Sequence, residues 1–209
     1  MTTLHCYEGL RLVELQQVTG FTIMSNNYSN FGAIRQLGYL VEDIDSAVDV
    51  WMQQLQVGPW TVIKNVPLLC TYMEQESAPI VDIALAYRGD MQIELIQQTN
   101  DAPSPYRKYF QQKRFGLHHT AYLSHDMGAT VEQAKALGHQ VVCDINMPDG
   151  ARYVYTQIEA LGNDVFVEFL DATPNMLKMF EYGIPAAAKW RPGLTPEKDV
   201  IVIDLSQRT

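Results

Sequence analysis

An internal repeat constrains the fold of this chain more than any other feature of its sequence. Residues 36–43 read Gln-Leu-Gly-Tyr-Leu-Val-Glu-Asp, and residues 119–126 read His-Thr-Ala-Tyr-Leu-Ser-His-Asp, at an offset of 83 positions. A second pair of segments, 90–96 and 164–170, matches at an offset of 74 positions. A repeat of this kind predicts two similar structural units within one chain.

Each repeat unit begins with a strand that leads into an amphipathic helix. After Asp43 and again after Asp126, apolar residues recur at the three- and four-residue spacing of a helix. Both aspartates are expected helix N-caps, because a short carboxylate accepts the free amide hydrogens of the first turn. The drop between the offsets places about nine additional residues in the first unit, and residues 65–80 are expected to form this extra loop. Further strands are expected at Trp60–Lys64, Val81–Arg88, Gln140–Asp144 and Arg152–Gln157.

The repeat predicts one α+β domain with an extension at each end. The domain is expected to span residues 32–172 and to consist of modules 32–100 and 115–172, each with the order strand, helix and two or three strands. Residues 1–31 are predicted to form an N-terminal extension. Residues 173–209 are predicted to form a C-terminal extension with a short helix and a last strand-like run.

The overall composition excludes several classes of partner. A formal net charge of -9 disfavours binding to nucleic acid and to anionic membranes. No apolar run approaches the roughly 20 residues that a membrane-spanning helix needs. The three cysteines lie far apart without metal-binding spacing, and no signal peptide is recognisable, so we expect reduced thiols and a cytoplasmic protein.

Strand alternation separates a helix-facing side from an inner side in each unit. In the last strand of each unit the odd-numbered residues are apolar and are expected to pack on the helices, which turns Glu94 and Glu168 to the inner side. In the first strand of each unit, Gln36 and His119 face inward. Each precedes a glycine or alanine by two positions, which leaves room beside it.

These four inward-facing residues together form a ligand set for one divalent metal ion. One imidazole, one amide oxygen and two carboxylates suit a first-row ion with positions open for water or substrate. Taken singly, each of these four residues is more often a surface or edge residue than a metal ligand. The neighbouring His118 is expected to face away from the site as a helix-side or edge histidine. The metal site is indicated because Glu94 and Glu168 are equivalent under one offset, and Gln36 and His119 under the other.

Over residues 34–172 the chain resembles the vicinal oxygen chelate superfamily. This superfamily includes glyoxalase I, methylmalonyl-CoA epimerase, extradiol dioxygenases and bleomycin or fosfomycin resistance proteins. The resemblance implies two βαβββ modules whose curled mixed sheet surrounds one metal site, and a homodimer. The segments that carry it are Ile34-Arg-Gln-Leu-Gly-Tyr-Leu-Val-Glu-Asp-Ile-Asp-Ser-Ala-Val-Asp-Val-Trp, Gln92-Ile-Glu-Leu-Ile-Gln, Gly116-Leu-His-His-Thr-Ala-Tyr and Val165-Phe-Val-Glu-Phe.

The resemblance does not select one member of the superfamily. The ligand order Gln, Glu, His, Glu resembles zinc-using glyoxalase I, yet Leu40 and Gln98 stand where that enzyme holds glutathione with an arginine and an asparagine. The segment that contains His119 resembles methylmalonyl-CoA epimerase, whose first two ligands are histidine and glutamine rather than Gln36 and Glu94. An extradiol dioxygenase would need a second histidine ligand.

The resemblance implies a metal-dependent isomerase, epimerase or lyase that enolises a small carbonyl or thioester substrate. The ion is expected to be Zn, Ni, Co, Mn or Mg, with Zn or Ni preferred, and to stabilise the developing oxyanion. Glu168 is the expected base, and Glu94 is expected to return the proton. The alternative function is non-catalytic sequestration of a small molecule on the same fold. Candidate pocket residues are Tyr72, Tyr87, Tyr106, Tyr153, Tyr155 and Trp60, with Arg88 and Arg152 as candidate anion-binding residues.

Overall fold

The computed structural model of the chain covers the two repeat units and the C-terminal extension. The predicted N-terminal extension, residues 1–31, lies outside the described residues except for Phe31. The described ranges are 31–162, 164–193 and 196–207.

Each repeat unit contains one long helix followed by strands, as the sequence predicts. A short helix, α2 (Arg107–Gln112), lies between the units and was not predicted. The first unit consists of β1 (Ile34–Leu40), α1 (Ile44–Gln53), β2 (Trp60–Pro67), β3 (Cys70–Tyr72), β4 (Gln75–Ser77), β5 (Ile80–Arg88) and β6 (Met91–Gln98). The second unit consists of β7 (Gly116–Ser124), α3 (Met127–Ala136), β8 (His139–Asn146), β9 (Arg152–Ile158), the 3-10 turn η1 (Glu159–Leu161) and β10 (Phe166–Asp171).

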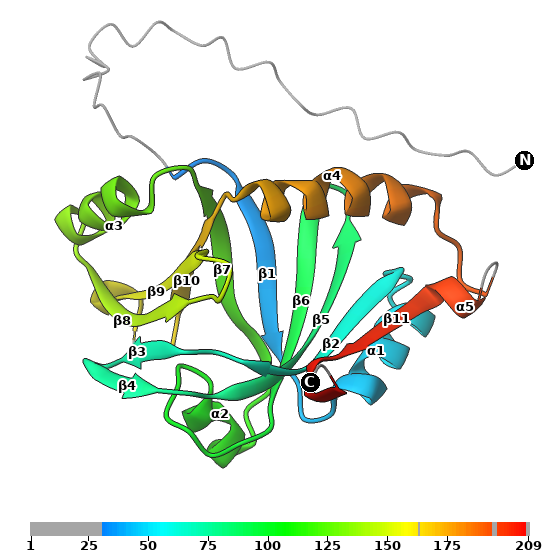
Figure 1. Cartoon of the computed structure of the whole chain (residues 1–209), viewed down its shortest axis with the longest axis horizontal. Helices are drawn as coiled ribbons and strands as arrows, with labels where there is room; N and C mark the ends of the chain where they lie inside the picture. The colour runs from blue at the N-terminus through cyan, green and yellow to red at the C-terminus, as the bar shows by residue number, and fades with distance from the viewer. Residues whose placement is uncertain (1–30, 163, 194–195, 208–209) are drawn as a thin grey trace, which may run out of the picture. The chain divides into compact units, whose positions relative to one another are not determined.

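The strands of both units and of the C-terminal extension form one mixed sheet, which is strongly curled (Figure 1). Within it, the order β2-β5-β6-β1 of the first unit is matched by β8-β9-β10-β7 in the second. In each unit the first and last strands are parallel neighbours, and antiparallel β1 and β7 join the two units at the centre. The predicted α+β class and curled mixed sheet are therefore confirmed.

The expected loop at residues 65–80 is instead largely strand. It contains the hairpin of β3 and β4, and β3 pairs with β8 of the other unit. The loop prediction was wrong because this hairpin has its hydrogen-bond partner in the second unit, which no local pattern reveals. The insertion thereby extends the far edge of the sheet.

The C-terminal extension is also more regular than predicted. The expected short helix is the 16-residue α4 (Pro174–Lys189), which begins at the N-cap Thr173 and lies along one rim of the sheet (Figure 1). The predicted last strand is β11 (Val200–Asp204), which runs parallel to β2. The remaining elements are α5 (Pro196–Asp199) and the 3-10 turn η2 (Leu205–Gln207).

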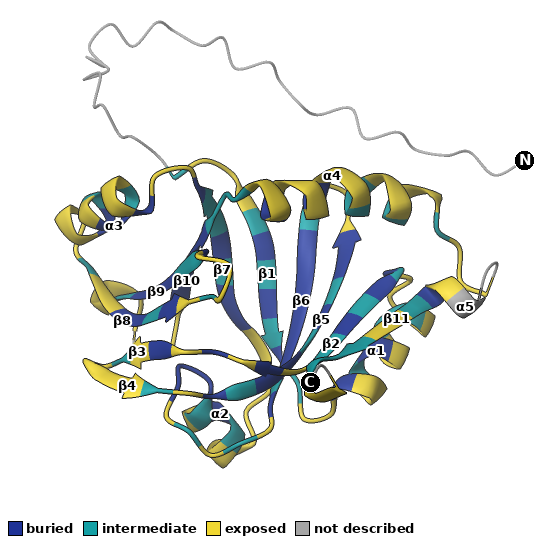
Figure 2. Cartoon of the chain, in the orientation of Figure 1, coloured by how far each residue is buried: buried dark blue, intermediate teal, exposed yellow. Residues whose placement is uncertain are grey.

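Buried residues concentrate along the strands (Figure 2), and α1 and α3 pack on the outer face of the sheet. Ile93 and Leu95 pack in one core with α1, and Val167 and Phe169 pack in another with α3. The alternation predicted for the two last strands is therefore confirmed, except at Val165, which precedes β10 and is 43% exposed.

Both predicted N-caps are present at the starts of the module helices. The carboxylate of Asp43 accepts a hydrogen bond from the amide of Ser46, and that of Asp126 accepts one from the amide of Ala129. These caps fix the points at which β1 and β7 turn into helices. Among the described helices, none has the length and apolar character that would let it cross a membrane.

Candidate metal centre

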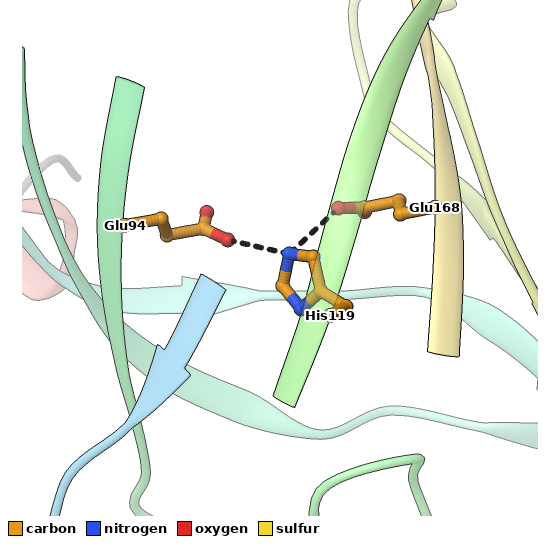
Figure 3. A group of neighbouring side chains, drawn as sticks. All are labelled: Glu94, His119 and Glu168. Carbon is orange, nitrogen blue, oxygen red and sulfur yellow. Dashed lines mark ion pairs between the residues drawn. The ribbon is translucent and has the colours of Figure 1, made fainter. Parts of the chain in front are cut away.

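The four predicted ligands meet at one point on the inner face of the sheet. Nε2 of His119 lies 3.1 Å from Oε2 of Glu168, 3.3 Å from Oε2 of Glu94 and 3.3 Å from Oε1 of Gln36. Figure 3 shows the two glutamates pointing toward the imidazole from opposite sides. Candidate donor atoms of His119 and the two glutamates all lie within 4.8 Å of one another, so the cluster could hold a metal ion.

Strand register explains why these residues meet. They come from β1, β6, β7 and β10, the four central strands of the two units. Gly38 on β1 is paired with Glu94 on one side and with His119 on the other. A Cβ atom at Gly38 would lie 1.8 Å from Cε1 of His119, so a glycine is required for the imidazole to occupy this place. Ala121, which is fully buried, is paired with Glu168.

The cluster is buried and carries uncompensated negative charge. His119 is 1% exposed and Glu168 is 3% exposed. Burial alone would lower the pKa of His119, but the carboxylates of Glu168 and Glu94 outweigh burial and raise this pKa to about 9. Burial also raises the pKa of Glu168. The site thus favours a positive charge among its donors.

Oε2 of Glu168 makes no hydrogen bond among the described residues, and its close contact is the ion pair with Nε2 of His119. A buried carboxylate oxygen without a partner is costly in an apolar protein interior. Here the oxygen faces an imidazole nitrogen, an amide oxygen and a second carboxylate, a donor set suited to a divalent cation. The residues present therefore fit the metal ion that the sequence predicts.

A chain of amides orients Gln36. Its Nε2 donates to Oε1 of Gln92 at 2.8 Å, and Nε2 of Gln92 donates to the hydroxyl of Tyr87 at 2.6 Å. The amide nitrogen of Gln36 is therefore engaged, and its oxygen faces the cluster. Sequence reasoning placed Gln92 on the inner face but assigned it no role.

His118 faces the site rather than the helix side or a sheet edge, which corrects the sequence prediction. The β1–β7 register shifts at this point, because Gly38 pairs with His119 whereas Tyr39 pairs with Leu117. This bulge leaves His118 without an opposite residue and lets both neighbouring imidazoles turn to the same side. His118 is 4% exposed and stacks on Phe166 with ring centroids 4.5 Å apart.

The contacts of His118 determine which nitrogen of His119 faces the ligands. Nε2 of His118 lies 3.2 Å from the carbonyl oxygen of Pro105, and this nitrogen must donate because a carbonyl only accepts. Burial lowers the pKa of His118, which favours the neutral ring. Its Nδ1 then accepts from Nδ1–H of His119 at 3.1 Å. When His119 is neutral, this arrangement leaves the lone pair of its Nε2 facing the cluster, as a metal ligand requires.

We expect His118→Phe to lower the affinity of the site for Zn²⁺ by about 10–100-fold. Phenylalanine preserves the stacking on Phe166 but removes the acceptor that orients His119. Isothermal titration of purified protein with Zn²⁺ measures the effect. The exposed His125→Phe serves as the control and should leave the affinity unchanged, and an equal affinity in both variants would contradict this role for His118.

Two tyrosines lie near Glu168. The hydroxyl of Tyr106 donates to that of Tyr155 at 2.9 Å. Burial raises the pKa of both tyrosines well above the usual value, and the charge of Glu168 adds to this effect, so both hydroxyls stay protonated.

A cavity of about 350 Å³ opens beside the cluster, with Gln36, Glu94 and Glu168 in its wall. Of the predicted aromatic residues, Tyr106, Tyr153 and Tyr155 line it. Trp60 does not line this cavity, because it is buried in the core beneath α1. Further predicted residues are also outside the lining: Tyr72, Tyr87, Arg88 and Arg152.

The two positions that distinguish the chain from glyoxalase I have structural roles. Leu40 is buried in the inner core. Gln98 donates to the carbonyl of Ala102 at 2.8 Å and accepts from the hydroxyl of Ser104 at 2.6 Å. Gln98 therefore fixes the segment after β6.

Comparison with known proteins agrees with this architecture. The sequence profile of the Glyoxalase/Bleomycin resistance protein/Dioxygenase superfamily matches residues 35–156. Because this match covers more than half of the chain, the protein belongs to that superfamily. No curated protein sequence matches the chain.

Solved structures are similar to the chain at low sequence identity. A hypothetical protein from Bacillus halodurans is 19% identical, with 68% of this chain and 94% of that chain covered and a TM-score of 0.50. Methylmalonyl-CoA epimerase from Mycobacterium tuberculosis is 14% identical, with 69% and 91% covered and a TM-score of 0.49. A variant of the Streptomyces coelicolor epimerase, solved with 2-nitronate-propionyl-CoA, is 16% identical, with 69% and 97% covered and a TM-score of 0.48.

Proposed function

We propose that the protein is a metal-dependent enzyme of the isomerase, epimerase or lyase type that removes a proton from a carbon next to a carbonyl group. Its metal ligands are Gln36, Glu94, His119 and Glu168. The observation that carries this proposal is the meeting of four potential ligands in a cavity wall, where Oε2 of Glu168 makes no hydrogen bond. A divalent cation bound there, with Zn or Ni preferred, supplies a Lewis acid for a developing oxyanion.

Glu168 is the proposed base. It lies in the cavity wall, and burial raises its pKa, which makes its carboxylate a stronger proton acceptor. Glu94 approaches from the opposite side of His119 and is 9% exposed (Figure 3). Glu168 takes the proton from one face of the substrate carbon, and Glu94 returns a proton to the other.

Hydrogen–deuterium exchange tests this proposal without knowledge of the natural substrate. Protein loaded with Zn²⁺ or Ni²⁺ is incubated in D₂O with ketones and simple thioesters, and exchange next to the carbonyl is followed by proton NMR. For at least one compound we expect exchange at least ~10²-fold faster than with chelator-treated protein. Absence of metal-dependent exchange for every compound that binds would contradict the proposed function.

The proposed partner is a small carbonyl or thioester compound. A homodimer and a cytoplasmic location stay predictions from the sequence. Sequestration without chemistry would leave exchange at the chelator-treated rate, so the same experiment separates the two functions.

A further inference from the structure

The C-terminal extension supplies one wall of the cavity beside the cluster. Met176 and Met179 on α4, Ile203 on β11 and Leu205 on η2 all line it. These residues lie beyond the segment that the superfamily profile matches. This part of the wall therefore comes from outside the matched segment.

Two contacts attach this extension to the sheet. β11 runs parallel to β2 from the Val200–Trp60 pair onward. α4 approaches β5 so closely that a Cβ atom at Gly183 would lie 2.0 Å from the ring of Tyr87. Phe180 packs edge-to-face on the same ring, with centroids 5.4 Å apart. The extension is thus a fixed wall against strands of the first unit (Figure 1).

The lining of the cavity has a small polar part and a larger apolar part. The polar part consists of the amides of Gln36 and Gln92, the carboxylates of Glu94 and Glu168, and three tyrosines. The rest of the lining is aliphatic or methionine, as in Ile63, Ile83, Leu85 and the four C-terminal residues. Among the described lining residues, Glu94 and Glu168 carry the only charges, and neither lysine nor arginine is present.

Two arginines next in sequence to lining residues are engaged elsewhere. The guanidinium of Arg152, a predicted anion-binding residue, pairs with Asp144. Arg35 lies over the ring of Phe180 and donates to the carbonyl of Asp90. Away from the metal cluster, a carboxylate or phosphate inside the cavity would therefore be buried without a counter-charge from the described lining residues. Such burial is strongly unfavourable.

We propose that the part of the substrate inside this cavity is an uncharged carbonyl group with an apolar hydrocarbon body, bounded by the C-terminal extension. This inference rests on the proposed function in one respect, namely that the carbonyl group of the substrate lies at the metal cluster. It excludes substrates that carry a carboxylate beyond the carbonyl, such as dicarboxylic thioesters. A cavity of about 350 Å³ lies at the small end of the usual range for ligand sites, which suits a compact hydrocarbon body.

A matched pair of ligands tests the inference. 2-Octanone and 7-oxooctanoate share the methyl ketone and the chain length, and they differ in one terminal carboxylate. We expect isothermal titration of Zn²⁺-loaded protein to give at least tenfold weaker binding for 7-oxooctanoate. Its neutral methyl ester should recover most of the affinity. Equal or tighter binding of 7-oxooctanoate than of 2-octanone would overturn the inference.

A matched pair of variants tests the role of the extension. Met179→Arg places a cation in the cavity wall, whereas Leu177→Arg places one on α4 outside the lining. The two native side chains are 39% and 40% exposed, so both substitutions are compatible with folding. We expect Met179→Arg alone to shift the affinity ratio at least tenfold toward 7-oxooctanoate. An unchanged ratio in Met179→Arg would overturn the assignment of this wall.

These binding measurements separate failure of the inference from failure of the proposed function. Selective binding of 2-octanone without deuterium exchange of any bound compound contradicts enolisation but supports the cavity's preference for neutral ligands. Metal-dependent exchange of charged compounds, together with tighter binding of 7-oxooctanoate, overturns the inference and leaves the proposed function in place.

Discussion

Glu168→Gln is expected to lower turnover, or the rate of deuterium exchange, by at least ~10²-fold, because an amide cannot accept the substrate proton. The affinity for metal should fall much less, since the amide oxygen still offers a ligand. The measurement is the rate per bound metal ion, with metal content determined on the same sample.

Two comparisons make this result specific to Glu168. Glu159→Gln changes an exposed glutamate of the same unit and should leave the rate unchanged. Glu94→Gln tests the second carboxylate and should reduce turnover of a substrate that needs a proton returned to the opposite face. Full activity of Glu168→Gln per bound ion would show that this residue is not the base.

Gly38→Ala is expected to abolish metal binding. The added methyl group would lie 1.8 Å from Cε1 and 2.2 Å from Nε2 of His119, so the imidazole must leave its place between the glutamates. Overpacking of a buried position also costs about 1–3 kcal/mol of folding free energy. Titration with Zn²⁺ measures the first effect, and urea denaturation measures the second.

Gly128→Ala is the matched control for this substitution. Gly128 lies in α3, and a Cβ atom there meets nothing closer than Asp126 Oδ1 at 3.4 Å, an ordinary contact. Alanine is also the better helix former, so this variant should be as stable as the wild type or slightly more stable. Normal metal affinity in Gly38→Ala would contradict the close packing of β1 on His119.

Much of the fold could be predicted from the sequence because it is a repeat with strong strand alternation. The offsets of 83 and 74 align residues that the sheet does bring to equivalent strands, and apolar odd-numbered positions indicate the face that α1 and α3 cover. The four candidate ligands were predicted for this reason, and the structure brings all of them together. Their role as metal ligands is a proposal.

The remaining features depend on contacts between segments that are distant in sequence. The pairing of β3 with β8 cannot be inferred from the hairpin residues alone. The inward orientation of His118 results from a bulge between β1 and β7, whereas strict alternation predicts the opposite side. The available signal for its role was its position directly before the candidate ligand His119 in the same strand.

The cavity wall from the C-terminal extension was unpredictable for a similar reason. Met176 and Leu205 carry no polar chemistry that marks a site, and they reach the cavity through the packing of α4 on Tyr87 and the pairing of β11 with β2. An apolar residue becomes a specificity determinant through its position, which the sequence of the extension does not reveal.

The metal content of the purified protein tests the central claim most directly. Wild-type protein and His119→Ala are incubated with Zn²⁺ or Ni²⁺, freed of excess ion by gel filtration and measured by inductively coupled plasma mass spectrometry. We predict about one ion per wild-type chain and near zero for His119→Ala, with unchanged circular dichroism. A wild-type chain that retains no divalent ion, or a variant that retains as much as the wild type, would contradict the proposed metal centre.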